Sequence, residues 1–152
     1  MHKKKKMEWF KTSVKDGKQQ VYDPIRKRYV ALTPEEQVRQ HTLKLLVEQV
    51  QVPTGLIAVE YSIKVNNLDK RCDIVVFDKT GSPLIIVECK AAHVKISEKT
   101  LDQAVRYHSA LKPRYIILTN GISLFCLFVT ANGIEPLSEI PSYTAMTEGN
   151  NP

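Results

Sequence analysis

Hydrophobic and polar residues follow periodic patterns that predict, in order, a helix, three strands, a second helix and two strands. The first helix, which ends near residue 50, has an apolar stripe at helical spacing, made up of Val38, Leu43, Leu45, Leu46, Val47 and Val50. The segment 56–65 instead alternates apolar residues with smaller or polar ones, which predicts a half-buried strand. Further strands are predicted over 71–77, 84–90, 114–119 and 122–130, and the second helix over 98–111.

Short polar signals mark the boundaries of these elements. Thr33 and Pro34 suit the N-cap and the first position of the first helix, and Glu36 suits the third position of a capping box. Asn120-Gly121 predicts a two-residue hairpin between the last two strands. We expect residues 1–18 to form a basic flexible arm, residues 19–131 one α/β domain, and residues 132–152 a loose tail.

The predicted hairpin of strands 71–77 and 84–90 contains the candidate chemistry. If residues 79–82 form its loop, the numbers of opposed residues add up to 161. Phe77 then faces Leu84, Val75 faces Ile86 and Asp73 faces Glu88. Side chains alternate between the two faces of a sheet with period two. Asp73, Glu88 and Lys90 therefore project from the same face.

Two carboxylates directly opposed across strands repel each other, and a divalent cation between them removes that repulsion. Carboxylate oxygens suit Mg²⁺ or Mn²⁺. Lys90 then places an ammonium group beside the metal, where it can orient or deprotonate a water or stabilise charge on a phosphoryl group. The pattern favours phosphodiester hydrolysis. The competing interpretation is a frayed strand end at Asp73 and a surface ion pair between Glu88 and Lys90.

Side chains of the two predicted helices add further candidates. On a helical wheel Glu35 falls near the centre of the apolar stripe and Glu36 towards its edge, so Glu35 either points to the metal or compensates the helix dipole. Gln103 and Tyr107 lie one turn apart, where they either hold a water or phosphate or are ordinary boundary residues. The four histidines, including His108, form no spaced set, and none is expected to be catalytic.

The three cysteines lie in apolar stretches without CxxC spacing, which favours reduced, buried thiols in a cytoplasmic protein over disulfides. The hairpin register places Cys72 opposite Cys89 on one face of the sheet. No run approaches the roughly 18 apolar residues of a membrane helix, and the basic start lacks the apolar region of a secretory signal. We therefore expect that the protein neither spans a membrane nor is secreted.

The net charge of +6 is concentrated at the N-terminus. Residues 1–30 contain ten Lys and Arg against three Asp and Glu, whereas the other 122 residues contain twelve against thirteen. Such an excess either binds a phosphate backbone without sequence preference or belongs to a solvated tail. The predicted nucleic-acid contacts are Lys3, Lys4, Lys5, Lys6, Arg26, Lys27, Arg28 and Arg39.

Four motifs follow one another along the chain: Thr33-Pro34-Glu35-Glu36-x-Val38-Arg39-Gln40, Arg71-x-Asp73-Ile74-Val75, Glu88-x-Lys90 and Gln103-x-x-x-Tyr107. The series resembles the N-terminal nuclease domain of type I restriction enzyme R subunits, especially the free-standing bacterial members of that family. The resemblance covers about residues 20–130. It implies an α/β fold of the PD-(D/E)xK nuclease superfamily, a restriction-endonuclease-like core with a mixed central β-sheet flanked by helices.

The resemblance also implies Mg²⁺- or Mn²⁺-dependent DNA cleavage. Asp73 and Glu88 match the family's metal ligands, and Lys90 matches the lysine that serves the water. Gln103 and Tyr107 match the family's QxxxY element, which assists near the site.

On the first helix, the family's acid matches Glu35 or Glu36, and the wheel favours Glu35 as the third metal ligand. The chain departs from the parent enzymes because it lacks a GxxxxGK[ST] loop, so that no ATPase motor is expected in it. Cys72 also stands where the family's motif has a proline before Asp73.

Three functions compete at this point. The first is a metal-dependent endonuclease acting on DNA in defence or DNA processing, for which double-strand cleavage is simplest in a homodimer or with a partner motor or specificity subunit. The second is a nucleic-acid-binding module that keeps the nuclease fold and cuts little, and the third is an assembly subunit of a restriction or DNA-processing complex. The set Asp73, Glu88 and Lys90 argues against the second, because a binding relic has no physical reason to keep opposed carboxylates.

Overall fold

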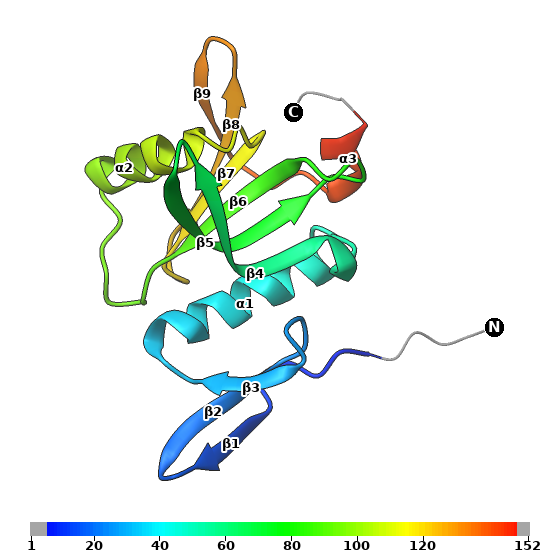
Figure 1. Ribbon diagram of the computed structural model, residues 1–152, viewed down its shortest axis with the longest axis vertical. Coiled ribbons are helices and arrows are strands. Elements are labelled where there is room, and N and C mark those ends of the chain that lie inside the picture. The colour runs from blue at the N-terminus through cyan, green and yellow to red at the C-terminus, as the bar shows by residue number, and fades with distance from the viewer. Residues whose placement is uncertain (1–5, 149–152) are drawn as a thin grey trace, which may run out of the picture.

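The computed structural model describes residues 6–148, and its central part follows the predicted order of elements (Figure 1). One six-stranded sheet has the strand order β4 (Ile57–Val65), β5 (Leu68–Phe77), β6 (Pro83–Cys89), β7 (Tyr115–Thr119), β8 (Leu124–Thr130) and β9 (Gly133–Leu137). Strands β6 and β7 are parallel, and the other neighbours are antiparallel. The expected mixed sheet of an α/β fold is therefore confirmed.

Helices cover both faces of this sheet. They are α1 (Pro34–Glu48), α2 (Glu98–Ser109) and α3 (Tyr143–Thr147), and a short 3₁₀ turn, η1 (Thr54–Leu56), precedes β4. Leu46 of α1 and Met146 of α3 are fully buried in the larger core cluster. On the other face Val75 and Ile86 pack against Leu111, just after α2. Helix α2 is the crossover that joins the parallel strands β6 and β7. Within residues 6–148, no helix has the length and apolar character needed to cross a membrane.

The predicted N-cap of α1 is confirmed, but the predicted capping box is wrong. The Thr33 hydroxyl accepts a hydrogen bond from the Glu36 N–H at 3.0 Å, and Pro34 is the first helical residue. The Glu36 carboxylate does not return to the Thr33 backbone, as a capping box requires. It accepts instead from the guanidinium groups of Arg26 and Arg39, which are stronger partners than a backbone amide.

Replacing Thr33 with alanine is expected to lower the free energy of unfolding by about 1 kcal/mol, because the Glu36 N–H loses its only side-chain acceptor at the helix start. Urea unfolding followed by circular dichroism measures this difference. Thr33→Ser keeps the hydroxyl and should stay close to wild type. Equal losses in the two variants would contradict a capping role.

The two predicted hairpins form, with local differences. Val75 pairs with Ile86 as predicted, but Phe77 opposes Pro83 rather than Leu84 because the register shifts between Val76 and Phe77. The second hairpin has a four-residue loop instead of two residues, since Thr119 pairs with Leu124. The reason is the Asn120 side chain, whose carbonyl oxygen accepts from the backbone N–H groups of both Ile122 and Ser123 and closes the wider loop.

The three thiols are free and buried, but two of them do not share a face as expected. Cys72 lies in the smaller cluster on the side of α2, whereas Cys89 lies in the larger cluster, with its sulfur 4.0 Å from the Thr42 hydroxyl of α1. The ladder between β4 and β5 is interrupted between Glu60 and Asp73, where Glu60 has a left-handed φ of 52°. The alternation of β5 breaks at the same place, because Cys72 shares a cluster with Val75 whereas Ile74 lies in the other cluster.

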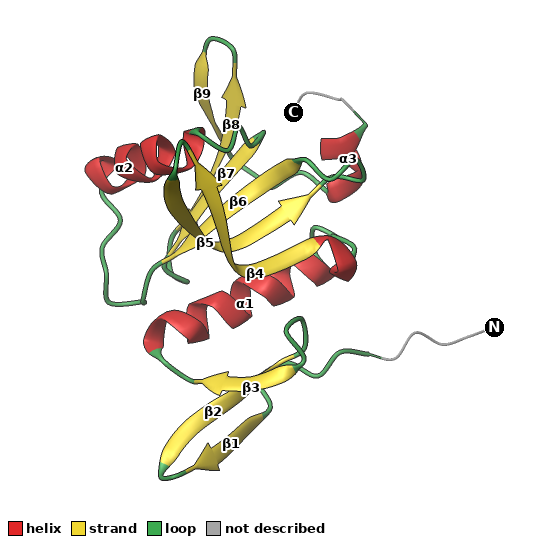
Figure 2. Cartoon of the chain, in the orientation of Figure 1, coloured by secondary structure: helices red, strands yellow, loops and turns green. Residues whose placement is uncertain are grey.

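Both terminal segments contain structure that the expected arm and tail did not include. Strands β1 (Thr12–Lys15), β2 (Lys18–Asp23) and β3 (Arg28–Ala31) form a separate antiparallel sheet, and α1 lies between it and the main sheet (Figures 1 and 2). The flexible arm is therefore wrong from residue 12 onwards. The tail is not loose either, because it contains β9 and α3, and the Tyr143 hydroxyl of α3 donates to the Phe77 carbonyl at 3.1 Å.

A carboxylate-lined candidate site between two helices

A cavity of about 280 Å³ opens where the pairing of β5 with β6 ends, between the first turn of α1 and the last turn of α2. Of the six residues predicted to be catalytic or metal-binding, five line it: Glu35, Asp73, Glu88, Lys90 and Tyr107. Residues far apart in the sequence thus meet in one place, because the hairpin brings β5 beside β6 and the helices close the two sides.

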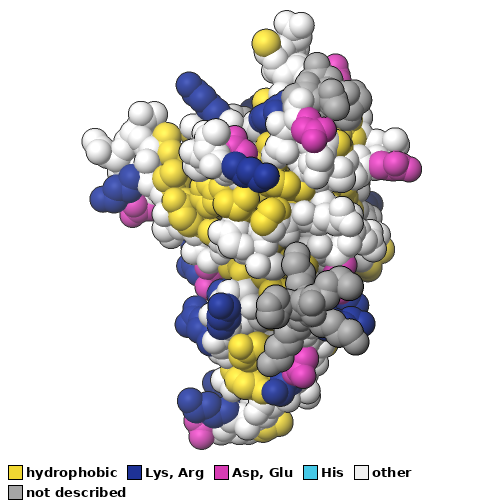
Figure 3. Space-filling view, turned by 90° about the vertical axis from the view of Figure 1, so that its right-hand side faces the viewer, with side chains coloured by type: hydrophobic (Ala, Val, Ile, Leu, Met, Phe, Trp, Pro, Cys, Tyr) yellow, Lys and Arg dark blue, Asp and Glu magenta, His cyan; other side chains and the backbone are white. Residues whose placement is uncertain are grey.

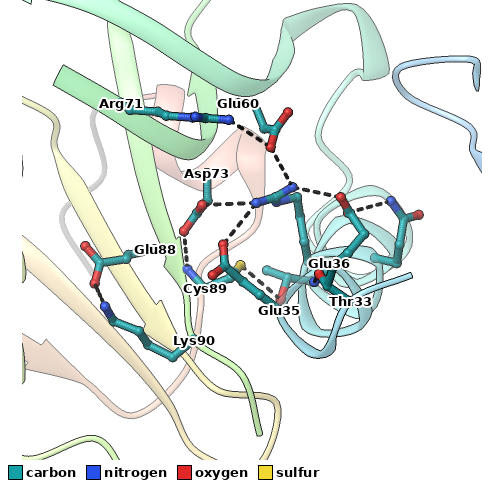
Figure 4. Close-up of polar contacts among 12 residues, drawn as sticks. Thr33, Glu35, Glu36, Glu60, Arg71, Asp73, Glu88, Cys89 and Lys90 are labelled. Carbon is teal, nitrogen blue, oxygen red and sulfur yellow. Dashed lines mark hydrogen bonds and ion pairs between the residues drawn. The ribbon is translucent and has the colours of Figure 1, made fainter. Parts of the chain in front are cut away.

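Asp73 is held by two fixed contacts. Its Oδ2 accepts a hydrogen bond from the Cys89 backbone N–H at 2.7 Å, and its Oδ1 lies 3.2 Å from a terminal guanidinium nitrogen of Arg39 (Figure 4). The last ladder pair between β5 and β6 is Ile74 with Val87, so Asp73 and Glu88 are the next residues beyond the regular pairing. The Asp73 side chain replaces a backbone group there as the partner of β6.

Glu88 has a polar partner at each carboxylate oxygen. Its Oε1 lies 3.1 Å from Nε2 of His108, and its Oε2 lies 3.2 Å from Nζ of Lys90. The hydrogen bond with His108 and the charge of Lys90 hold the pKa of Glu88 below its usual range, against the opposing effect of burial. Glu88 is therefore ionised at neutral pH.

His108 is a site residue that the sequence reasoning missed. Its side chain is almost completely buried, and its second ring nitrogen, Nδ1, lies 3.9 Å from the Cys72 sulfur. A signal was present in the sequence: His108 follows Ala104 by one helical turn, and Ala104 belongs to the apolar stripe of α2. A histidine in that stripe must face the sheet, where β6 ends at Glu88 and Cys89.

The burial of the two acids in the first turn of α1 is the reverse of what the helical wheel predicted. Glu36, placed near the edge of the stripe by the wheel, is buried, whereas the Glu35 side chain is 49% exposed. Glu35 still lines the cavity, and its Oε1 lies 3.1 Å from Arg39. Desolvation and the neighbouring Asp73 carboxylate raise the pKa of Glu35.

Behind the cavity lies a largely buried ion-pair network of two arginines and four acids: Arg26, Arg39, Asp23, Glu36, Glu60 and Asp73. The central contacts join Glu36 to Arg26 at 2.6 Å and to Arg39 at 2.8 Å. The side chains of Arg26 and Arg39 are only 10% and 6% exposed. Both were predicted to contact nucleic acid, and the structure corrects this, because their guanidinium groups are already occupied by buried carboxylates.

The other predicted nucleic-acid contacts lie elsewhere. Lys6, Lys27 and Arg28 are exposed, and Lys3, Lys4 and Lys5 lie outside the described residues.

The two residues of the predicted QxxxY element are separated. The Tyr107 hydroxyl accepts from the Arg71 backbone N–H at 2.9 Å, and Nζ of Lys70 lies 4.2 Å from the centre of the Tyr107 ring. Gln103 is exposed and does not line the cavity. The expected pairing of an amide and a phenol in one site is therefore not present in this conformation, since the polar flank of α2 turns Gln103 to solvent.

Comparison with known sequences assigns the chain to a family. The profile described as type I restriction enzyme R protein N terminus matches residues 34–141. The chain belongs to this family. All eight residues that line the cavity lie within the matched range, whereas the sheet of β1–β3 precedes it.

A solved structure supports the same fold. This member of the R protein N-terminal family is similar to the fragment structure of a putative HsdR subunit of a type I restriction enzyme from Vibrio vulnificus YJ016, with a TM-score of 0.57 and 20% sequence identity. The similarity covers 77% of this chain and 25% of that chain, so this chain matches about a quarter of the length of its structural relative. No protein with a curated description matches the sequence.

The donor set of this family member fits a hard divalent cation in one particular way. Within residues 6–148, no group of three or more His, Cys, Asp and Glu side chains is arranged to hold a metal ion. The predicted three-carboxylate set with Glu35 is therefore not assembled. Mg²⁺ commonly binds through one or two carboxylates and completes its shell with waters and substrate phosphates. Asp73 and Glu88, which line one open cavity, provide the chemistry for that mode.

Proposed function

We propose that this R protein N-terminal family member is a Mg²⁺- or Mn²⁺-dependent deoxyribonuclease that hydrolyses phosphodiester bonds at the cavity of Asp73, Glu88 and Lys90. The observation behind the proposal is that two carboxylates and a lysine ammonium line one cavity of about 280 Å³ in a chain of this family. A purely structural ion pair would not need a cavity large enough for several waters or a phosphate group.

Asp73 and Glu88 would hold the cation, which supplies positive charge to the phosphate and its departing oxygen. Both carboxylates are oriented before any ligand binds. Asp73 is fixed by the Cys89 N–H and by Arg39, and Glu88 is fixed by His108. Such preorganisation lowers the entropic cost of reaching the reactive geometry. His108 is on this view a positioning residue for Glu88.

Lys90 and Glu35 would act on the attacking water and the phosphate, Lys90 as a hydrogen-bond donor and positive charge and Glu35 as a proton acceptor. The Lys90 ammonium, 37% exposed, can donate to the attacking water or to the charge that develops on a phosphate oxygen. Glu35 is the carboxylate best suited to accept a proton from that water, because its pKa is raised towards neutrality by burial and by Asp73. Lys90 in turn keeps a charged partner in Glu88 when no substrate is bound.

DNA is the substrate partner in this proposal, and the reduced thiols suit a cytoplasmic protein. A single centre cuts one strand. Cleavage of both strands would then take two copies of the chain, or a motor or specificity subunit of a restriction system that presents the second strand.

Cleavage of supercoiled plasmid, branched DNA and single-stranded DNA with Mg²⁺ or Mn²⁺ tests the proposal. We expect the wild type to cut at least one of these substrates only when metal is present. Lys90→Ala should lower the rate about 10²–10⁴-fold, because a group that transfers a proton or stabilises charge in the transition state contributes that much.

Lys79→Ala is the matched control, since Lys79 is an exposed lysine in the loop at the other end of the same hairpin. It should cut like the wild type. If no substrate is cut with metal while DNA binding remains salt-sensitive, the binding module replaces the nuclease as the function.

A further inference from the structure

The outer face of the N-terminal sheet combines positive charge with aromatic rings. Lys15 pairs directly with Lys18, and Tyr22 pairs with Tyr29. Because residues two apart on a strand share a face, Lys18 and Tyr22 of β2 lie on the same side of the sheet. The other side is the inner one, where Val21 is buried.

The paired lysines are held close together by the backbone. Asp16 and Gly17, with φ of 52° and 75°, form a tight two-residue turn between Lys15 and Lys18. Like charges directly opposite each other destabilise an antiparallel pair, and no described acid forms an ion pair with either lysine. A polyanion at this face would remove the repulsion.

The exposed charges of this part of the chain are unbalanced. Among residues 6–31, the exposed cations are Lys6, Lys11, Lys15, Lys18, Lys27 and Arg28, and the exposed acids are Glu8 and Asp16. In the view of Figure 3, Lys and Arg side chains lie on several sides of the lower part of the molecule, which this sheet forms, with Asp and Glu side chains among them. Tyr29, 38% exposed, adds a ring on which a base can stack.

The sheet is fixed relative to the candidate active site. Arg26, in the connection from β2 to β3, pairs with Glu36 of α1 at 2.6 Å and with Glu60 of β4 at 3.3 Å. Glu36 also binds Arg39, which donates to Asp73. Buried ion pairs thus connect the sheet to a residue of the cavity.

A groove lies beside the cavity, on the side of the N-terminal sheet. It has a volume of about 440 Å³, and Arg28 and Tyr29 of β3 line it together with Glu35. Glu35 also lines the cavity of Asp73 and Glu88. The groove and the cavity thus share Glu35 as a lining residue. Glu36 and Glu60 also line the groove, with their carboxylates paired to Arg26 and Arg39.

We propose that the outer face of β1–β3 is a DNA-binding surface, on which Lys15 and Lys18 contact the sugar–phosphate backbone and Tyr29 contacts a base. The surface directs the bound strand along the groove to the cavity. It lies outside the range that matches the R protein N-terminal family, which makes it an addition to the nuclease core. The inference rests on the proposed function in that it takes DNA as the substrate.

Fluorescence anisotropy with labelled single-stranded and duplex DNA, in EDTA and at 50 to 200 mM salt, tests this surface without cleavage. Each lost phosphate contact reduces the slope of log K against log salt by about 0.7 to 0.9. For Lys15→Gln/Lys18→Gln we therefore expect a slope smaller by almost two, so that the affinity ratio between the two salt concentrations falls about tenfold.

Two further variants make the result specific. Lys79→Gln/Lys112→Gln removes two exposed lysines that do not line the cavity or the groove and should leave the slope unchanged. Tyr29→Leu should weaken binding of single-stranded DNA more than of duplex DNA, because stacking needs an unpaired base. The unfolding midpoint of each variant should be no lower than that of the wild type, so that weaker binding cannot come from unfolding.

The outcomes separate this inference from the proposed function. An unchanged slope for Lys15→Gln/Lys18→Gln, in a protein that still cuts DNA with metal, overturns the surface and leaves the nuclease. A reduced slope in a protein that cuts nothing supports the surface and overturns the nuclease. Equal slopes in the test and control double variants overturn the surface in either case.

Discussion

Arg39→Met is expected to lower the free energy of unfolding by about 3–5 kcal/mol, because Asp73 loses its arginine partner and the buried Glu36 keeps only Arg26. Arg39 is the only guanidinium within hydrogen-bond distance of both Glu36 and Asp73 among the described residues. Although burial acts to lower it, the pKa of Arg39 is raised by Glu36 and Asp73, so the side chain stays charged. Urea unfolding at neutral pH measures the loss.

Lys44→Met on the same helix is the matched control. The Lys44 side chain is 42% exposed and forms a 4.0 Å ion pair with Glu48, one turn on. Exposed pairs of this kind contribute little, and the change should remain within about 0.5 kcal/mol. If both variants lose the same amount, the network does not stabilise the fold and the argument for a prearranged Asp73 fails with it.

The sequence predicted those parts of the site that depend on local periodicity. The pairing of Val75 with Ile86 follows from alternation along two strands and from the length of one loop. The same arithmetic placed Asp73 and Glu88 at the end of the hairpin, where the cavity opens. Even there the alternation fails within β5, because Cys72 lies in the same cluster as Val75 and not with Ile74.

What the sequence could not predict are contacts between elements that are distant in the chain. Besides Asp23, which is three residues away, the partners of Arg26 are Glu36 and Glu60. These two long-range contacts are decided only when helix α1 packs against β4 and the N-terminal sheet. A guanidinium in a basic segment looks the same in sequence whether it binds phosphate or a buried carboxylate. Arg26 and Arg39 were assigned the first role for that reason.

The N-terminal sheet is a different case, because its signal was present. Its strands β1 and β3 have only four residues each, too few for a clear alternation, and the high lysine content favoured a flexible arm. Asp16-Gly17 is nevertheless a strong hairpin dipeptide between two short segments. If the dipeptide had counted for more than the lysine content, the sequence would have predicted β1 and β2.

Asp73→Asn is expected to abolish metal-dependent cleavage, with a loss of roughly 10³-fold or more. A cation contributes several kcal/mol of charge stabilisation to the transition state, and every 1.36 kcal/mol corresponds to a factor of ten. The amide oxygen of asparagine can still accept from the Cys89 N–H, so the fold should remain intact. Plasmid cleavage and thermal unfolding with and without metal measure the two effects together.

The unfolding measurement shows whether the loss comes from metal binding. At a hundredfold excess of Mg²⁺ or Mn²⁺ over its dissociation constant, the wild type should gain about 2.7 kcal/mol of stability, and Asp73→Asn should gain far less. Asp69→Asn, an exposed aspartate on the same strand, should respond like the wild type. If Asp73→Asn is stabilised by metal as strongly as the wild type, the cation binds elsewhere. The cavity would then be a structural ion-pair site, and an assembly role would explain the chain better than catalysis.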